Sequence, residues 1–580
     1  MYSKEPHRLS AAALGLALTF TLFGCTRPST VADLVLINGV IYTADSLNPQ
    51  VSALAVSADS ILALGSDEMI EALVGPETQV IDLQGRMAMP GFIEGHAHFM
   101  SLGESRMILD LTQARSWEEI VGMVGDAASE SEPGAWIAGR GWHQEKWDSL
   151  PPGPLVDGVP AHRSLSRASP ENPVLLEHAS GHAAFANERA LRKGAVSAET
   201  LDPPGGEIVK DVRGEPTGLL RETAQRLVSS AMNADLDQRT AEQILAEKHR
   251  QAQLAAEAAL ENGITSFHDA GASFETIDFY KRLVDEGRLP LRLYVMVGGE
   301  SPDSLDAHLG HYRMDDYGDM LTVRSIKQVI DGALGSHGAW LLEPYEDMMT
   351  SSGLNTGSIE AIRRSAEIAA ANGFQVNTHA IGDRGNREVL DIYQEFLANS
   401  SDPTGQRWRI EHSQHLHPDD IPRFGALGVI ASMQAVHCTS DGPWVPKRIG
   451  DKRAQEGAYV WQSLWGTGAV VTNGTDAPVE DVNPIPSFYA SVTRRLSDGT
   501  VFYPEESLTR EQALEAYTIN NAYAAFQEDK LGSLAPGKWA DVVVLSRDIM
   551  TAPEEEILDA EVVYTIVGGK VAYTGMMNDE

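Results

Sequence analysis

The middle of this 580-residue chain alternates short apolar segments with amphipathic ones, and this rhythm constrains the fold more than any other feature. Apolar runs separated by helical patterns, such as those over residues 358–372 and 386–399, are typical of parallel strands joined by crossover helices. Eight segments have the strand pattern: 91–98, 263–270, 291–297, 323–331, 374–381, 408–414, 429–436 and 469–476. Eight strand–helix units predict an α/β fold built on a TIM-type (β/α)8 barrel.

Both ends of the chain carry strand patterns that do not alternate with helices. Short apolar runs follow one another between residues 31 and 87, with a hairpin signal at Asn38-Gly39. Similar runs cover residues 531–545 and 560–573. We therefore expect residues 26–87 and 530–580 to form one small β-sandwich together. The barrel of residues 88–529 would lie between them in the sequence.

The barrel rhythm has one long interruption, which covers residues 112–222 and separates the first predicted strand from the second. A segment inserted at the C-terminal end of a barrel strand lies over the face that carries the active site in TIM barrels. We expect this insertion to form a lid or a wall of a substrate pocket. A purely structural subdomain is the alternative.

The first 25 residues have the pattern of a lipoprotein signal peptide. Basic residues precede an uncharged stretch over residues 9–24, which is shorter than the roughly 20 residues of a membrane-spanning helix. The stretch ends in Leu-Phe-Gly-Cys25, which resembles a bacterial lipobox and predicts lipidation of Cys25. An uncleaved anchor and an ordinary secretory signal are the alternatives. The segment predicts a protein anchored by lipid at the periplasmic face of a bacterial membrane, the outer more than the inner, or a secreted one.

The charge of the chain argues against nucleic acid as a partner. Lys and Arg number 45 against 82 Asp and Glu, which gives a net charge of −37. So acidic a surface repels phosphate groups. The expected partner is a small-molecule substrate, with membrane contact only through the lipid, and assembly into a homo-oligomer stays open.

Histidines at the ends of predicted strands indicate a metal site. His96 and His98 point to the same side of an extended strand, and neutral imidazoles are common zinc ligands. A chance pair is the alternative, because the chain has 17 histidines. Candidates on later strands are Lys327, His379, His412 and Asp476. Because barrel strands converge at their C-terminal ends, all six side chains could reach one cavity.

Six motifs together resemble the amidohydrolase superfamily. The nearest resemblance is to amidohydrolase family 3, a long-insert group that includes an N-substituted formamide deformylase. The motifs are Pro90-Gly-Phe-Ile-Glu-Gly-His-Ala-His98, Gly181-His-Ala-Ala-Phe-Ala-Asn187, Asp331-Gly-Ala-Leu-Gly-Ser336, Asn377-Thr-His-Ala-Ile-Gly-Asp383, Arg409-Ile-Glu-His412 and Gly474-Thr-Asp-Ala-Pro478. Each motif is weak alone, but the set is specific and spans nearly the whole chain after the signal segment.

This resemblance implies a divalent metal centre with one or two ions, zinc first among the candidates. His96 and His98 would bind a buried ion, while His379 and His412 would bind a second ion or share the first. Lys327 resembles the position at which many such enzymes carry a carboxylated lysine, an anion able to bridge two cations. The alternative is an unmodified lysine paired with an acid such as Asp331.

The resemblance also implies which residues carry the chemistry. A divalent metal can lower the pKa of bound water to about 7. Asp476 would take a proton as that water attacks a carbonyl, and would return it to the leaving nitrogen. His182, in the insertion, would polarise the carbonyl or line the pocket, with a packed loop histidine as the alternative.

The expected activity is therefore hydrolysis of a carbon–nitrogen bond other than a peptide bond, in a linear amide or a formamide-like molecule. A cyclic amidohydrolase or a deaminase would use the same ligands, so both remain open. A solute-binding lipoprotein without catalysis is a further alternative, against which the complete set of six candidate ligands argues.

Overall fold

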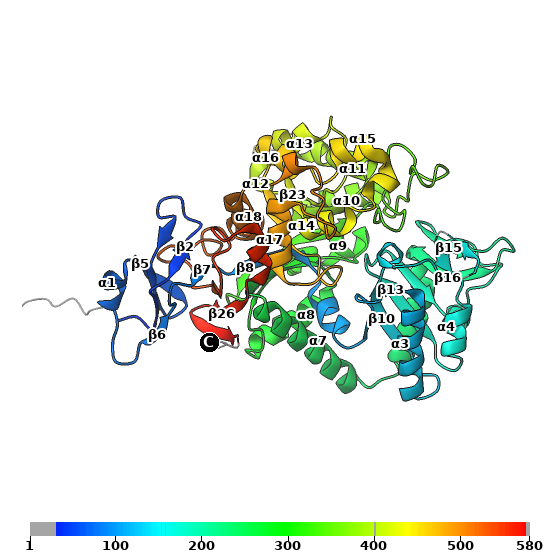
Figure 1. Ribbon diagram of the computed structural model, residues 1–580, viewed down its shortest axis with the longest axis horizontal. Helices are drawn as coiled ribbons and strands as arrows, with labels where there is room; N and C mark the ends of the chain where they lie inside the picture. The colour runs from blue at the N-terminus through cyan, green and yellow to red at the C-terminus, as the bar shows by residue number, and fades with distance from the viewer. Residues whose placement is uncertain (1–30, 152, 157, 399–401, 576–580) are drawn as a thin grey trace, which may run out of the picture.

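A computed structural model (Figure 1) describes residues 31–575 of the protein, except 152, 157 and 399–401. The predicted signal peptide and Cys25 lie outside the described residues. Within those residues, no helix combines the length and the apolar character needed to cross a lipid bilayer.

Eight parallel strands form the barrel, and all eight predicted strand segments are confirmed. In their order around the barrel they are β8 (Phe92–Ala97), β17 (Ile264–Ala272), β18 (Arg292–Val297), β20 (Leu321–Val329), β21 (Gln375–Ala380), β22 (Arg409–His412), β23 (Ile430–Met433) and β24 (Val471–Asn473). A short strand, β19 (Met314–Tyr317), pairs antiparallel with β20. The fold class predicted from the alternating pattern is therefore confirmed.

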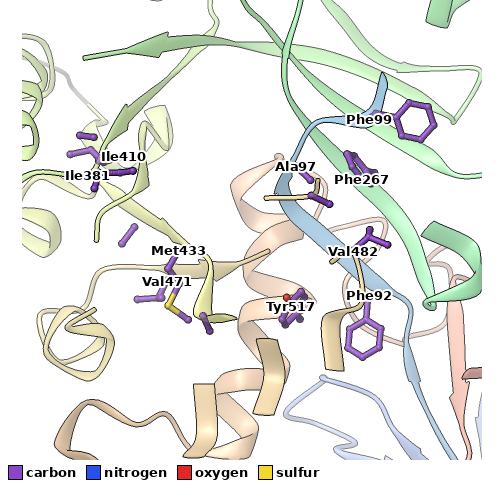
Figure 2. Packing of buried hydrophobic residues seen from close by; sticks show 14 of the residues in the cluster. Phe92, Ala97, Phe99, Phe267, Ile381, Ile410, Met433, Val471, Val482 and Tyr517 are labelled. Atoms are coloured by element: carbon purple, nitrogen blue, oxygen red, sulfur yellow. The ribbon is translucent and has the colours of Figure 1, made fainter. Parts of the chain in front are cut away.

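Helices between the strands cover the outside of the barrel, and α10 (Ile359–Ala371) shows why they form. The hydroxyl of Ser358 caps the helix by accepting a hydrogen bond from the backbone N–H of Ala361. Ile362, Ala366 and Ala369 are buried on one face. Figure 2 shows another part of this core, where the rings of Phe99 and Phe267 lie 5.3 Å apart between centroids.

Backbone hydrogen bonds join the C-terminal end of the first barrel strand to the segment that follows the last strand. The N–H of Asp476 donates to the carbonyl of His96, and the N–H of His98 donates to the carbonyl of Ala477, each at 2.8 Å. The segments that carry three of the predicted metal ligands are thus held side by side.

The two chain ends together build a pair of packed sheets, which lie at one side of the barrel in Figure 1. One sheet has the order β5 (Ser60–Gly65), β4 (Ala53–Ser57), β1 (Leu34–Ile37), β6 (Gln79–Asp82). The other has the order β27 (Lys570–Thr574), β26 (Val562–Val567), β25 (Val542–Leu545), β7 (Met87–Pro90), β2 (Val40–Tyr42), β3 (Gln50–Val51). Leu36 and Val56 of the first sheet share a hydrophobic cluster with Val544 and Ile566 of the second. Strand β7 runs to Pro90, past the boundary expected at residue 87.

The insertion forms a six-stranded sheet of its own, at the side of the barrel away from the terminal sheets (Figure 1). The strand order is β15 (Gly206–Lys210), β16 (Pro216–Glu222), β14 (Ala183–Ala186), β13 (Val174–His178), β10 (Ile137–Trp142), β9 (Leu109–Asp110). Its helices α3 (Trp117–Glu130) and α4 (Arg163–Ala168) share a separate hydrophobic cluster with these strands. The sheet begins at Leu109, before the start expected at residue 112, because β9 pairs with β10.

Candidate metal centre

Three residues from distant parts of the chain form a compact group of metal-binding atoms at the barrel mouth. His96, His412 and Asp476 are buried, and each offers one ligand atom within 4.8 Å of the others. His98 adds a fourth group, because its Nε2 lies 3.3 Å from Oδ1 of Asp476. Two imidazoles and a carboxylate, with a third imidazole beside them, are a donor set that suits zinc and similar ions.

The other predicted site residues lie around this group. Nζ of Lys327 is 3.2 Å from Nε2 of His96. The ring of His379 packs 4.4 Å from that of His412 and 5.1 Å from that of His182, measured between centroids. The structure therefore brings the six expected ligands and His182 into one neighbourhood.

Unusual backbone conformations place two of these side chains. The φ angles of His412 and Asp476 are 78° and 59°, in a region that residues other than glycine rarely adopt. At His412 this angle ends the regular alternation of the strand. As a result Glu411 and His412, although adjacent, both contact His96.

Glu411 fixes the orientation of His96. Its Oε2 lies 2.5 Å from Nδ1 of His96, with both side chains fully buried. Burial alone would raise the pKa of Glu411, but His96, Arg409 and Lys327 lower it below its usual value. The ionised carboxylate can only accept, so Nδ1 of His96 carries the proton and Nε2 offers its lone pair to a metal.

The pKa of His96 itself favours metal binding. Burial lowers this pKa, and the charge of Lys327 lowers it further. The ring is therefore held neutral, which is the form that coordinates a cation.

Glu94 ties the first strand to the segment after the last one. Its carboxylate accepts hydrogen bonds from the backbone N–H of His96 at 3.1 Å and of Thr475 at 2.8 Å, and from the Thr475 hydroxyl at 2.9 Å. Burial raises the pKa of Glu94 to about 8. A Cβ on Gly474 would lie 2.2 Å from Oε1 of Glu94, so only glycine leaves room for this carboxylate.

Two side chains after the seventh strand complete the surroundings of the centre. Oε1 of Gln434 lies 2.7 Å from Nδ1 of His412, and Nε2 of His437 lies 3.7 Å from Oδ2 of Asp476. Burial alone would raise the pKa of Asp476, but His437, His98 and His412 lower it well below its usual value. Asp476 is therefore a carboxylate.

Unsatisfied buried atoms show that the site suits a cation. Oδ1 of Asp476 and Nε2 of His379 are buried without a hydrogen bond, although His98 lies near the former and Asp331 3.6 Å from the latter. Buried polar atoms are rarely left unpaired in proteins. Both atoms are good metal ligands, so the residues present fit a divalent ion.

Lys327 reaches the centre from the fourth strand and does not pair with Asp331. The carboxylate of Asp331 instead accepts hydrogen bonds from the backbone N–H groups of Trp340, Ile381 and Gly382. Asp331 is therefore not the acid beside Lys327; the acids whose charges act on this lysine are Glu411, Asp476 and Asp269. Burial lowers the pKa of Lys327, which increases its share of neutral amine.

A small cavity of about 50 Å³ opens beside the centre. Its walls include His379, His412 and Asp476 of the barrel. The insertion contributes His143, Lys146, Ala179, Ser180 and His182 to the same walls. A molecule in this cavity would touch both the insertion and the metal-binding group.

Sequence reasoning missed Glu411, Gln434, His437 and Glu222, whose Oε2 lies 2.8 Å from Nδ1 of His182. Glu411 stands inside the motif of residues 409–412 and directly precedes a predicted ligand, which was a usable signal. Gln434 and His437 follow the seventh strand, one of three barrel strands to which no site residue had been assigned. Glu222 has no such signal, because its contact with His182 depends on how two strands of the insertion align.

Comparison with known proteins matches the chain to a family model described as "Amidohydrolase family" over residues 79–573. The chain is 34% identical over 570 residues to Protein LONG AFTER FAR-RED 3 of Arabidopsis thaliana, covering 95% of this chain and 94% of the plant protein. It is 30% identical to the putative amidohydrolase YtcJ of Bacillus subtilis (92% and 98% covered). It is 26% identical to the N-substituted formamide deformylase of Arthrobacter pascens (93% and 98% covered).

A solved structure shares the architecture. It is an uncharacterized metal-dependent hydrolase from Pyrococcus horikoshii, with a TM-score of 0.71 and 27% identity. The likeness covers 90% of this chain and 99% of that one.

Proposed function

The chain belongs to the amidohydrolase family, and we propose that it is a metal-dependent hydrolase acting on linear amides or formamide-like molecules. One observation carries this proposal: two imidazoles and a carboxylate place ligand atoms within 4.8 Å of one another beside a cavity. The likeness to N-substituted formamide deformylase along nearly the whole chain supports the choice of substrate class.

His96, His412 and Asp476 would hold the ion, and His98, His379 and Lys327 lie close enough to take part. When bound, a divalent cation such as zinc would polarise the scissile carbonyl and make water a better nucleophile. We propose one or two ions, with Lys327 carboxylated. In that modification the neutral amine forms a bond to the carbon of CO2 and releases a proton, which the lowered pKa of Lys327 favours.

Asp476 is the proposed proton carrier. It is ionised and lines the cavity, so it can accept the proton that water loses as its oxygen attacks the carbonyl carbon. When the carbon–nitrogen bond breaks, Asp476 would return that proton to the leaving nitrogen.

His182 is the proposed contact to the substrate carbonyl. Its Nδ1 is engaged by Glu222 at 2.8 Å, which leaves Nε2 for a molecule in the cavity. Burial alone would lower the pKa of His182, but the charge of Glu222 raises it above its usual value. The charged ring would donate a hydrogen bond from Nε2 to the carbonyl oxygen as negative charge develops there.

Metal content and substrate range test this proposal together. Soluble protein expressed with added zinc should hold a stoichiometric ion, and should release amine from N-substituted formamides or linear N-acyl amides. Faster hydrolysis of cyclic amides, or release of ammonia from an amidine, would favour the ring-opening or deaminating alternatives. A protein without stoichiometric metal, or with metal and no hydrolysis of any of these substrates, would contradict the proposal.

We also propose that the chain works outside the cytoplasm, anchored through Cys25. The lipobox-like segment supports this location. Cells fed labelled fatty acid should incorporate the label into the parent chain but not into a Cys25→Ser variant. Label in both chains would refute lipidation at Cys25.

A further inference from the structure

Glu222, a buried residue at the end of β16, pairs with the partly buried His182, which directly precedes β14. Oε2 of Glu222 lies 2.8 Å from Nδ1 of His182. The two residues are also linked through their backbones, since the N–H of Glu222 donates to the carbonyl of His182 at 2.9 Å. Strands β14 and β16 pair antiparallel at this point, with Ala183 opposite Arg221. The sheet of the insertion therefore sets the position of the whole pair.

The backbone at Glu222 is strained. Its φ and ψ are 49° and −126°, a conformation that a residue with a Cβ adopts rarely and at a cost. Such strain persists in native proteins where a side chain has to be aimed at a particular place.

Two glycines of the barrel make room for the carboxylate of Glu222. A Cβ on Gly332 would lie 2.0 Å from Oε1 of Glu222, and a Cβ on Gly338 would lie 2.2 Å from the same atom. Neither glycine has the positive φ that would itself require glycine. The space that Glu222 needs thus explains both glycines. It also explains why glycine follows Asp331 in the motif of residues 331–336.

One oxygen of the Glu222 carboxylate, Oε1, is buried without a hydrogen-bond partner. Among the described residues, His182 is the one ion-pair partner of Glu222. An unsatisfied buried acceptor on a strained backbone lowers stability, so packing alone does not explain this glutamate.

We propose that Glu222 is a positioning residue for His182. By accepting a hydrogen bond from Nδ1–H in either protonation state of the ring, it fixes the ring plane and directs Nε2 into the cavity beside Asp476. The insertion would thus supply a His–Glu pair to the barrel's metal centre. This inference rests on the proposed function, because it assigns His182 a contact with the substrate carbonyl.

A double-mutant cycle tests the pairing. Glu222→Ala should lower kcat by about 10- to 100-fold, with little change in KM and an unchanged metal content. Glu222→Gln keeps the size and an acceptor oxygen, and should restore much of the lost rate. In a His182→Ala background, Glu222→Ala should cost almost nothing further. The proposal would be overturned if the two substitutions lowered kcat independently, so that their effects multiplied in the double variant. Loss of metal from the Glu222 variants would also overturn it.

Substitution of Gly338, one of the two glycines that leave space for the Glu222 carboxylate, gives an independent test. Gly338→Ala should lower kcat in the parent, because its new methyl group displaces the carboxylate, but not in the Glu222→Ala background. Gly122→Ala is the matched control, since a Cβ there meets no atom within 4 Å. If Gly338→Ala also lowered kcat in the Glu222→Ala background, the claim that Gly338 makes room for Glu222 would be refuted.

A spectroscopic readout separates this inference from the proposed function, because it needs no substrate. In protein labelled with 15N-histidine, the Nδ1–H signal assigned through His182→Ala should vanish or shift in Glu222→Ala. An unchanged signal would refute the positioning role, whatever the activity. Absence of any hydrolysis alongside the expected shift would instead count against the proposed function, and would leave the pairing of His182 with Glu222 supported.

Discussion

Nδ1 of His96 and Oε2 of Glu411 lie 2.5 Å apart, although 315 positions separate the two residues in the chain. This contact leaves His96 a single nitrogen for a metal, and that nitrogen faces Asp476 at 3.7 Å. Glu411, which orients the ligand His96, is therefore as much a part of the metal site as His96 itself.

Glu411→Gln should weaken metal binding without unfolding the protein. The amide keeps the size and an acceptor oxygen but loses the charge that holds the Nδ1 proton on His96. We expect about a 10- to 100-fold loss of affinity, measured by competition with a chelator. An affinity equal to that of the parent would contradict the role assigned to Glu411.

Asp476→Asn should retain much of the bound metal and lose turnover. An amide oxygen can still approach the ion, but it cannot accept the proton from water. A loss in kcat of about 10²- to 10⁴-fold is expected from removing a proton carrier. Asp419→Asn, at a side chain 84% exposed, is the matched control and should leave kcat unchanged. Undiminished turnover in Asp476→Asn would refute the proton transfer.

Carboxylation of Lys327 should be visible by NMR. Protein stripped of metal, then given zinc and 13C-bicarbonate, should show a carbamate signal in the parent and none in Lys327→Ala. Lys452→Ala, at a side chain 83% exposed, should keep the signal. A fully active parent enzyme without a carbamate signal would mean that Lys327 acts unmodified.

His415 should make stability fall as the pH is lowered. Burial lowers the pKa of His415 to about 3, below its ordinary value of 6.5. Between pH 6.5 and pH 3, His415 therefore binds a proton in the unfolded chain but not in the folded protein. The free energy of unfolding has its full value above pH 6.5 and decreases as the pH falls below that value. Between pH 7 and pH 5 this group alone should remove about 2 kcal/mol of unfolding free energy.

The variant His415→Gln should lack that part of the decrease. Denaturant unfolding of metal-free protein at the two pH values isolates the effect from metal release. His417→Gln is the control, because that side chain is 40% exposed. Equal pH dependence in the parent and in His415→Gln would show that the folded protein also protonates His415.

The barrel and most of the expected ligands could be predicted because both follow from local pattern. Apolar runs of strand length recur along the chain, and residues such as His379 sit at their ends, where barrel geometry brings them together. His96 and His98 needed only the two-residue period of a strand to be placed on one side. These inferences do not depend on which segments pack against which.

Residues that act through a partner could not be predicted in the same way. The role of Glu411 depends on its reaching His96 across the barrel, and on the positive φ of His412, which no sequence period encodes. The place of Glu222 depends on the alignment of β14 with β16 and on two glycines more than a hundred residues further along the chain. Such contacts exist only once the tertiary structure has formed.

The hydrogen bonds between the His96–His98 segment and the Asp476–Ala477 segment carry a consequence for biosynthesis. One part of the metal-binding group emerges early from the ribosome and the other part nearly four hundred residues later. A growing chain cannot hold the ion in this geometry until the last strand has joined the first. The chain should therefore bind the metal late, after synthesis of the barrel is complete. A bound metal would then indicate that the first and last barrel strands have come together.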